Sequence, residues 1–288
     1  MKPVYAKILE GSEIETFATK EICRPNFSTE FHFHSACQIT YIIQSSGKRI
    51  IGDSVDRFST DELTFIGSNL PHVWHNDLKP QQPHEEARSI ALYLEPSLFL
   101  DSIKKFFNPH KIETFLHLSK RGLLFFGDTK KQLKQKLQEI VAVPYGLKKT
   151  TMLFEIIDIL IHTEEYIFLS SAGYTNNYRP QDNDKIDRIF KYVFDNYSKD
   201  MVLDSVAALS NMSKHAFCRY FKSRTQKTFI QFVNEVRISE ACKLLGEDTL
   251  QITSIAYHCG FNNLSHFNKI FKAVKGATPR EYKLRFLG

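Results

Sequence analysis

Hydrophobic residues follow two different periods along the chain, and the change falls near residue 127. Before it, short apolar or alternating runs such as FHFHSACQITYII (31–43) and RSIALYLE (88–95) are separated by turn-forming residues, which is typical of β-strands. After it, apolar residues recur every three or four positions, which is typical of amphipathic helices. The pattern predicts a compact all-β segment over residues 1–127 with helical segments beyond it.

Two adjacent helices are predicted over residues 128–168. Each carries an apolar stripe, and Pro144 and Gly146 mark the turn between the two helices. The stripe residues are Leu133, Leu137, Ile140 and Val141 in the first helix and Met152, Ile156, Ile157 and Leu160 in the second. Such a hairpin can cover the β segment, pair with a second copy of the chain, or do both. We expect it to be the dimerisation element of a homodimer.

The stretch SSAGYTNNYRPQDND (170–184) contains small, polar and turn-forming residues with almost no aliphatic side chains. This composition predicts an exposed linker over residues 169–183, so that a second domain occupies residues 184–288. The second domain opens with KIDRIFKYVFDNY (185–197), whose apolar residues share one wide helical face.

The second domain contains an internal repeat. SVAALSNMSKHAFCRYFK (205–222) recurs as SIAYHCGFNNLSHFNKIFK (254–272). The first halves of the copies align at an offset of 49 residues and the second halves at 50, as in the pairs Ala207/Ala256, Phe217/Phe267 and Phe221/Phe271. The one-residue difference falls between two predicted helices, where a turn tolerates it.

Between the copies, TFIQFVNEVRISEACKLL (228–245) has the apolar spacing of a helix. Gly246 follows it, and glycine commonly ends a helix in the left-handed conformation. The chain is therefore predicted to carry two helix-turn-helix units joined by a linker helix, in an all-α domain.

A helix-turn-helix unit reads DNA with the exposed N-terminal half of its second helix, while cations on that helix contact phosphates. The candidates for this role are Ser213, Lys214, His215, Cys218 and Arg219 in the first copy and Asn263, Ser265, His266 and Lys269 in the second. Ser213 is predicted to cap its helix. Arg219 is the strongest candidate for bidentate pairing with guanine, and the amide of Asn263 is suited to adenine. Lys269 can reach guanine or a phosphate.

The distribution of charge supports a polyanionic partner for the second domain. The formal net charge of the chain is +6, and residues 184–288 hold 17 Lys and Arg against 10 Asp and Glu, whereas residues 1–183 hold 21 against 22. All of the positive excess therefore lies in the C-terminal third. A basic module attached to a neutral domain is typical of a nucleic-acid-binding protein.

Residues 184–286 resemble the DNA-binding domain of the AraC/XylS family of bacterial transcription regulators. The family pattern is present as Gly260-Phe261, Phe267, Phe271-Lys272, Gly276, Thr278-Pro279 and Tyr282. The resemblance implies seven helices, two of which enter successive major grooves on one side of the DNA. It also implies that activation through contact with RNA polymerase is the commoner behaviour. Gln226 departs from the pattern, because the first copy often has glycine at the position equivalent to Gly276.

Three histidines stand out in the β segment. His32 and His34 are two residues apart on a predicted strand and so project from one face. Gln38, four residues after His34, is predicted to project from the same face. His72 follows in FIGSNLPHVWH (65–75). This arrangement resembles the cupin barrel, whose motifs supply an HxH pair, a nearby Glu and a later His to a metal. Gln38 stands where the Glu would be, which removes the anionic ligand.

Two interpretations of these residues remain open. His32, His34, Gln38 and His72 can line the pocket of a small-molecule effector, as the resemblance to AraC-type sensors implies, or three neutral imidazoles can hold zinc, iron or copper. We expect an effector pocket without a metal or other cofactor. Ile39, Tyr41 and Ile43 have the opposite parity, so that face of the strand is expected to pack under the helices of residues 128–168.

Other features exclude several classes of protein. The five cysteines are scattered without a CxxC pair, which indicates neither a disulfide framework nor a thiolate zinc site. The N-terminus has no apolar signal core, and Glu155 and Asp158 interrupt the most apolar helix. These features predict a soluble cytoplasmic protein that does not bind a membrane.

The sequence therefore predicts a sequence-specific transcription regulator, not an enzyme, with a cupin-like effector-binding β-barrel, a helical hairpin and a two-headed DNA-binding domain. Its expected partners are operator DNA, a small-molecule effector, a second copy of the chain and RNA polymerase. Two alternatives remain. One is a cupin metalloenzyme or metal sensor with an accessory DNA-binding domain, against which Gln38 argues. The other is a sequence-independent nucleic-acid binder, against which the duplicated helices argue.

Overall fold

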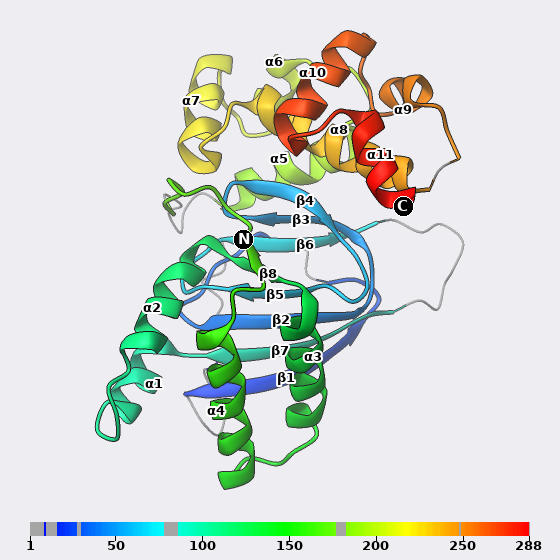
Figure 1. Ribbon diagram of the computed structural model, residues 1–288. Coiled ribbons are helices and arrows are strands. Elements are labelled where there is room, and N and C mark those ends of the chain that lie inside the picture. Colours follow the sequence, from blue (N-terminus) through cyan, green and yellow to red (C-terminus); the bar gives the residue numbers. More distant parts are fainter. Residues whose placement is uncertain are drawn as a thin grey trace. The chain divides into compact units, whose positions relative to one another are not determined.

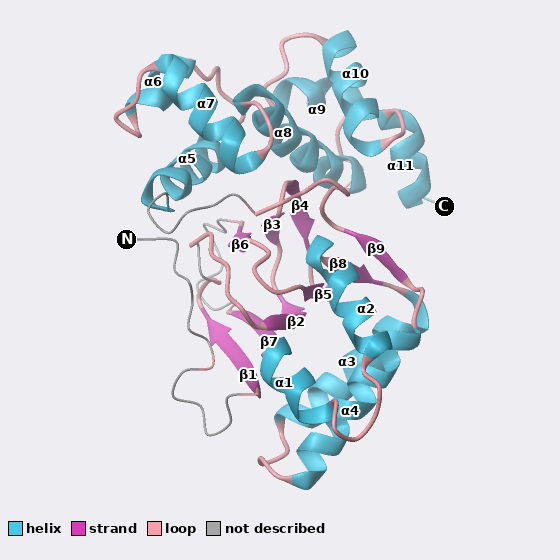
Figure 2. Cartoon of the chain, turned by 90° about the vertical axis from the view of Figure 1, so that its left-hand side faces the viewer, coloured by secondary structure: helices cyan, strands magenta, loops and turns pink. Residues whose placement is uncertain are grey.

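Strands dominate the first half of the chain and helices form the second, as the two hydrophobic periods predict (Figures 1 and 2). The computed structural model describes residues 9, 16–27, 30–77, 86–176, 183–247 and 249–287. The backbone divides into two compact units, one mainly before and one mainly after residue 177. In the described residues, the mixed architecture is a sheet-rich N-terminal unit followed by a helical C-terminal unit.

The strands of the N-terminal unit form two sheets in the part of the chain that the structure describes. The larger sheet is antiparallel with the strand order β1-β7-β2-β5-β8-β9, and the smaller has the order β4-β3-β6. The strands are β1 (Phe17–Arg24), β2 (Cys37–Gln44), β3 (Gly47–Ile51), β4 (Ser54–Phe58), β5 (Leu63–Ile66), β6 (His72–Asn76), β7 (Ala87–Leu94), β8 (Leu123–Phe125) and β9 (Tyr166–Phe168).

Strand β2 is buried on both of its faces. Ile39 and Tyr41 point into a large apolar core that the helices share, which confirms the packing that their parity predicts. On the opposite face, Ile42 packs in a second core with Ile66 of β5 and with residues of the smaller sheet. The two sheets therefore face each other across one side of β2, and the helices cover the other side.

Helices α1 (Pro96–Ile103) and α2 (His110–Leu118) lie in the segment predicted to be all-β, and that prediction is wrong for these residues. Pro96 stands at the start of α1, where its fixed φ and missing N–H are tolerated. Phe99 and Ile103, one helical turn apart, are both buried in the large core. Although the apolar residues of α1 have helical spacing, the segment is too short for that spacing to distinguish a helix from the end of a strand.

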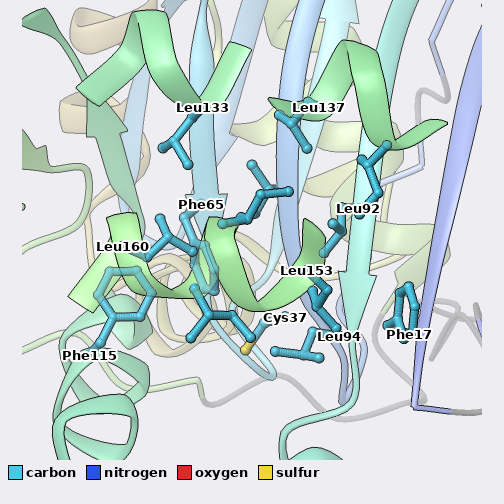
Figure 3. Packing of buried hydrophobic residues seen from close by; sticks show 14 of the residues in the cluster. Phe17, Cys37, Phe65, Leu92, Leu94, Phe115, Leu133, Leu137, Leu153 and Leu160 are labelled. Atoms are coloured by element: carbon cyan, nitrogen blue, oxygen red, sulfur yellow. The ribbon is translucent and has the colours of Figure 1, made fainter. Parts of the chain in front are cut away.

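Helices α3 (Gly127–Val141) and α4 (Leu147–His162) form the predicted hairpin. Leu133 and Leu137 of α3 and Leu153 and Leu160 of α4 point toward the sheet (Figure 3). The apolar stripe of each helix is thus buried against the strands, so covering the β segment is one role of the hairpin. The helices end at His162, and β9 occupies the last residues of the range predicted to be helical.

The first part of the predicted linker packs within the N-terminal unit. The backbone of Ser170 pairs with that of Arg121, whose guanidinium also donates to the Ser170 carbonyl oxygen from Nη2 at 3.0 Å. Tyr174 packs against the core between the two sheets. The prediction of an exposed linker is therefore wrong for Leu169, Ser170 and Tyr174, whereas residues 171–173 are exposed as predicted. Residues 177–182 of the predicted linker lie outside the described residues.

Seven helices make up the described part of the chain from residue 183 onward. They are α5 (Asn183–Asn196), α6 (Leu203–Ala208), α7 (Lys214–Thr225), α8 (Phe229–Gly246), α9 (Ile252–His258), α10 (Leu264–Lys275) and α11 (Pro279–Leu287). The N-terminal half of α8 packs against α5 and α7, where the Phe232 ring stacks on Phe190 at a centroid distance of 4.8 Å. Its C-terminal half packs against α9 and α10 through Ile238 and Leu245.

The two copies of the sequence repeat have matching turns. The N–H of Met212 donates to the Ala207 carbonyl oxygen at 3.1 Å, and that of Phe261 donates to Ala256 at 3.0 Å. The residue before each donor is left-handed, Asn211 with φ 52° and Gly260 with φ 86°. The 49-residue offset therefore holds through Phe261, and the extra residue of the second copy is Asn262.

The repeat continues beyond the segment recognised in the sequence. Thr228 begins α8 and Thr278 begins α11, each with a reciprocal side-chain and backbone capping pair to the residue three positions later. Phe232 contacts Phe221 at a centroid distance of 5.4 Å and an interplanar angle of 75°, and Tyr282 contacts Phe271 with the same two values. The start of α8 and α11 are therefore equivalent elements.

Gln226 adopts the conformation of its glycine counterpart. It caps α7 with φ 58° and ψ 12°, and Gly276 caps α10 with φ 71° and ψ 0°. The departure from the family pattern leaves the turn unchanged. Gly246, by contrast, lies inside α8 without a positive φ, and Glu247 ends the helix in a right-handed conformation. The predicted left-handed stop at Gly246 is wrong.

These two glycines predict opposite effects of one substitution. Gly276→Ala places a Cβ in a left-handed residue and is expected to lower the free energy of unfolding by about 1–2 kcal/mol. Gly246→Ala lies in right-handed helix with open space around the added Cβ, and is expected to raise it by up to about 1 kcal/mol. Urea unfolding followed by far-UV circular dichroism measures both. Equal shifts of the same sign would contradict the assigned conformations.

Candidate nucleic-acid interface and histidine cluster

Helix α7 presents one apolar face to its own unit and one polar face to solvent. Phe217 and Phe221 are fully buried, because they pack against α5 and α8. The predicted residues Lys214, His215, Cys218 and Arg219 are all exposed, and Ser213 lies directly before the helix. The structure therefore brings the first group of candidate residues together on the accessible side of α7.

Ser213 begins α7 as predicted. Its Oγ accepts a hydrogen bond from the Ala216 N–H at 3.4 Å, and its backbone is extended. The Nζ of Lys214 lies 3.4 Å from a carboxylate oxygen of Asp204 on the preceding helix. Arg219 projects from the exposed surface one turn after His215, where no acidic residue of α7 can neutralise it.

Helix α10 repeats this arrangement fifty residues later. Phe267 and Phe271 are buried, and Ser265, His266 and Lys269 are exposed. The Oδ1 of Asn263 accepts a hydrogen bond from the His266 N–H at 3.0 Å, so Asn263 is the helix cap equivalent to Ser213. Adenine pairing requires both the oxygen and the amide N–H groups of an Asn side chain. The geometry therefore favours a capping role for Asn263 over the base-reading role inferred from the sequence.

Three exposed residues of these helices were missed in the sequence. Asn268 lies on the accessible surface of α10 at the position equivalent to Cys218. Lys222 and Lys272 are exposed three residues after Arg219 and Lys269, and side chains three apart are neighbours on a helix. The 50-residue offset would have identified Asn268, because it pairs this residue with the candidate Cys218. For Lys222 and Lys272, which pair with each other, the available signal was their spacing of three residues from Arg219 and Lys269.

Electrostatics makes both helices suited to a polyanion. Helix α7 contains four Lys and Arg, α10 contains three Lys, and neither contains Asp or Glu. The N-terminus of each helix adds unpaired backbone N–H groups and a partial positive charge. Cationic helices of this kind bind nucleic-acid phosphates and lose affinity as salt is raised.

The N-terminal unit gathers the three predicted histidines at one place. His32 and His72 lie opposite each other, and each donates its backbone N–H to the other's carbonyl oxygen, at 3.1 and 2.8 Å. Their rings have a centroid distance of 4.4 Å, and the ring of His34 lies 5.0 Å from that of His72. One ring nitrogen from each of the three lies within 4.8 Å of the others. The prediction that His72 joins the HxH pair is confirmed.

Each of the three rings is oriented by a backbone carbonyl. The Nδ1 atoms of His32, His34 and His72 lie 2.7 Å from the carbonyl oxygens of Glu30, Ala36 and Leu70 respectively. A carbonyl oxygen only accepts, so each Nδ1 carries a proton. In a neutral imidazole the Nε2 atom then has a free lone pair.

Burial keeps these imidazoles neutral. It lowers the pKa of His34 to about 4, with a further contribution from neighbouring His32. Burial is also the main cause that lowers the pKa of His32, and it lowers the pKa of His72 well below its usual value. The buried Nε2 of His72 has no hydrogen-bond partner among the residues that the structure describes, and His32 is partly exposed while His34 and His72 are buried. The cluster therefore opens at His32.

Gln38 contacts the cluster through its side-chain amide. The amide lies 3.1 Å from the Nε2 of His34 and 2.6 Å from the Thr40 hydroxyl oxygen. The oxygen of the amide faces the His34 Nε2, and its NH₂ group donates to the Thr40 hydroxyl oxygen. A neutral His34 that carries its proton on Nδ1 would instead favour the amide turned by 180°. Gln38 thus lies beside His34, as expected for a residue an even number of positions along the strand.

None of the helices that the structure describes is long and apolar enough to cross a bilayer.

Comparisons with known proteins identify the helical unit. The sequence model of a helix-turn-helix domain matches residues 206–285. The transcriptional activator RhaR of Mannheimia succiniciproducens is 23% identical over 262 residues, which cover 89% of this chain and 87% of that protein. An uncharacterised helix-turn-helix regulator of Pseudoalteromonas carrageenovora is 36% identical over 95 residues, 33% of this chain and 56% of that protein.

Among solved structures, ToxT from Vibrio cholerae O395 aligns with 94% of this chain and 99% of its own, at 16% identity and a TM-score of 0.37, a value that supports no conclusion about a shared fold. The match to the helix-turn-helix domain covers both copies of the repeat and both exposed basic helices. The similarity to regulators named RhaR extends over nearly the whole chain. Together, the helix-turn-helix match and these relatives support an AraC/XylS-type DNA-binding transcription regulator.

Proposed function

We propose that the chain reads two adjacent blocks of operator DNA with α7 and α10 and couples this reading to an effector held by the N-terminal unit. The observation that carries the proposal is the pair of equivalent helices, each capped at its start, basic, free of acidic residues and exposed on one face. Helices with these properties enter a major groove with their N-terminal halves.

Each helix pair acts as one helix-turn-helix unit in this proposal. The short helices α6 and α9 precede equivalent left-handed turns, and the turns lead into α7 and α10. Since α8 packs against both pairs, it holds the two reading helices in one rigid body. A rigid spacing would let both helices contact the same side of the duplex at once.

The residues of the exposed faces divide into two roles. Arg219 and Lys269 occupy equivalent positions near the middle of their helices, where a side chain reaches base edges, and Arg219 can donate two hydrogen bonds to guanine. Lys222 and Lys272, one turn later, are suited to phosphates. His215, Ser265 and the exposed Asn268 provide shorter polar contacts on the same faces.

The N-terminal unit, extending to residue 176, serves as the sensor. The cluster of His32, His34, Gln38 and His72 is the proposed effector site of a cupin-like domain, and an effector would act by favouring the conformation that it binds better. Because the apolar stripes of α3 and α4 are buried against the sheet, a homodimer contact would have to involve the outer surface of the hairpin. Leu147, 84% exposed at the start of α4, lies on that surface.

The direction of control is proposed to be activation. The relatives named RhaR are transcriptional activators, and activation through contact with RNA polymerase in the cytoplasm is consistent with a regulator of this type. Catalysis forms no part of the proposal, because the relatives are regulators.

Selection of bound duplexes from a random-sequence pool tests this function directly. The full-length protein is incubated with the pool at physiological salt, and the bound DNA is sequenced. Two enriched blocks whose centres are about 10 base pairs apart are the expected result. Binding without enrichment, with an affinity that depends on salt alone, would identify a sequence-independent binder and overturn the proposal.

Substitution of the reading residues tests the assigned faces. Arg219→Ala and Lys269→Ala are each expected to weaken binding to the selected sequence by about 1–3 kcal/mol and to relax the preference in one block only. Lys191→Ala, an exposed lysine of α5, is the matched control and should change neither property. Titration by fluorescence anisotropy gives the affinities. Unchanged affinity in both variants would show that other side chains read the DNA.

Asn263 provides a separate test of capping against base reading. Asn263→Ala removes the helix cap and should lower the free energy of unfolding by about 1 kcal/mol. Asn263→Ser keeps a capping oxygen and should preserve both stability and sequence preference. Asn262→Ala, at the exposed neighbouring position, is the control for stability. If Asn263→Ser is stable but loses preference within its block, Asn263 reads a base and the capping assignment is incomplete.

A further inference from the structure

We propose that Arg237 is a positioning residue for the second reading helix, because it fastens the end of α5 to the turn that precedes α10. The inference rests on the proposed function, in which α10 reads one of two blocks of DNA. Arg237 lies near the middle of α8, outside both reading helices. Its role is therefore to orient α10 and not to contact the nucleic acid.

The guanidinium of Arg237 holds two backbone carbonyl groups that follow α5. Its Nε donates to the Tyr197 carbonyl oxygen at 2.8 Å, and its Nη2 donates to that of Lys199 at 3.0 Å. Since α5 ends at Asn196, these acceptors lie directly after the negative end of the helix dipole, where a cation is stabilised. The planar fork of an arginine can serve both acceptors at once.

The same guanidinium is close to an aromatic ring of the second helix-turn-helix unit. Its central carbon lies 5.6 Å from the centroid of the Phe261 ring, a distance at which a cation is attracted to the ring face. Arg237 is partly buried, and this burial lowers the pKa of its guanidinium, which still stays protonated at neutral pH. The two carbonyls and the ring together compensate a charge that is partly withdrawn from water.

The segment after α5 also packs directly on the turn before α10. Gly260 has a φ of 86°, and a Cβ added there would lie 2.8 Å from the carbonyl oxygen of Ser198. The next residue, Phe261, is buried, and its ring contacts two residues of α10, His266 at a centroid distance of 5.9 Å and Phe267 at 5.2 Å. A continuous set of contacts therefore runs from the end of α5 through the guanidinium and the Phe261 ring to the start of α10.

The first reading helix is held in another way. Phe221 of α7 packs on Phe232 of α8, which stacks on Phe190 of α5, and these ring contacts do not involve Arg237. At the position of the aromatic ring in the second turn, the first copy has Met212, which offers a cation no ring face. Loss of the Arg237 contacts should therefore misplace α10 and leave α7 where it is.

Arg237→Met tests this assignment, because it removes the charge and both hydrogen bonds while it keeps an unbranched apolar stem. The natural full-length chain and the variant are titrated by fluorescence anisotropy with the selected duplex and with two duplexes in which one block is replaced. The block whose preference Lys269→Ala relaxes is the α10 block. We expect the variant to bind the selected duplex about tenfold more weakly. Replacing the α10 block should weaken its binding by a factor at least about threefold smaller than for the natural chain, whereas replacing the α7 block should weaken both equally.

Two further variants separate orientation from stability. Lys191→Met removes a charge from the exposed surface of α5 and should leave the effect of replacing either block unchanged. Arg237→Lys keeps the charge but lacks the planar fork that serves both carbonyls, so its selective loss should lie between those of the natural chain and Arg237→Met. This conservative variant also carries the test if Arg237→Met does not fold.

The outcomes distinguish this role from the proposed function. If the folded Arg237 variants lose affinity to the same degree for all three duplexes, Arg237 only stabilises the unit, because partial unfolding lowers the active fraction for every duplex equally. The positioning role is then overturned, and unchanged affinity in Arg237→Met overturns it as well. If neither replaced block weakens binding by the natural chain, the proposed function itself has failed, and the role of Arg237 fails with it.

Discussion

Packing around α8 is the constraint on which the helical unit depends. Phe232, near its start, contacts Phe190 and Phe221, while Leu245, near its end, is buried in the core formed with α9 and α10. The 18-residue helix α8 therefore connects the packing of α7 with that of α10.

Duplication explains how a short sequence builds two equivalent surfaces. Each copy repeats the left-handed turn, the capped helix, the left-handed helix end and the aromatic contact with the next helix, for which Phe221/Phe232 and Phe271/Tyr282 have equal geometry. The buried residues of the copies are alike, whereas most of the exposed ones differ, Lys222 and Lys272 being an exception. The packing is thus repeated while the exposed faces of α7 and α10 carry different side chains.

In the N-terminal unit, strand β2 lies between the core under the helical hairpin and the histidine cluster. Its residues on one side, including Ile39 and Tyr41, fill the core under α3 and α4, and Gln38 on the other side contacts His34. The histidine cluster and the helical hairpin therefore contact opposite faces of the same strand.

The sequence by itself determined the features that depend on near neighbours along the chain. The apolar spacing of α3, α4 and α5, the Ser213 cap and the 50-residue repeat are all written in local patterns, because a helix repeats every 3.6 residues whatever surrounds it. The parity of β2 likewise determined which of its side chains face the helices and which face the histidines.

Only the tertiary structure decided features that depend on contacts between distant segments. It placed α1 and α2 in a segment with strand-like runs, used residues 169–174 to complete the sheet unit, and kept Gly246 helical. It also left the buried His72 Nε2 without a hydrogen-bond partner in the described part of the chain. Local pattern does not specify these outcomes, because each is set by whichever distant donor, acceptor or apolar surface the fold brings within contact.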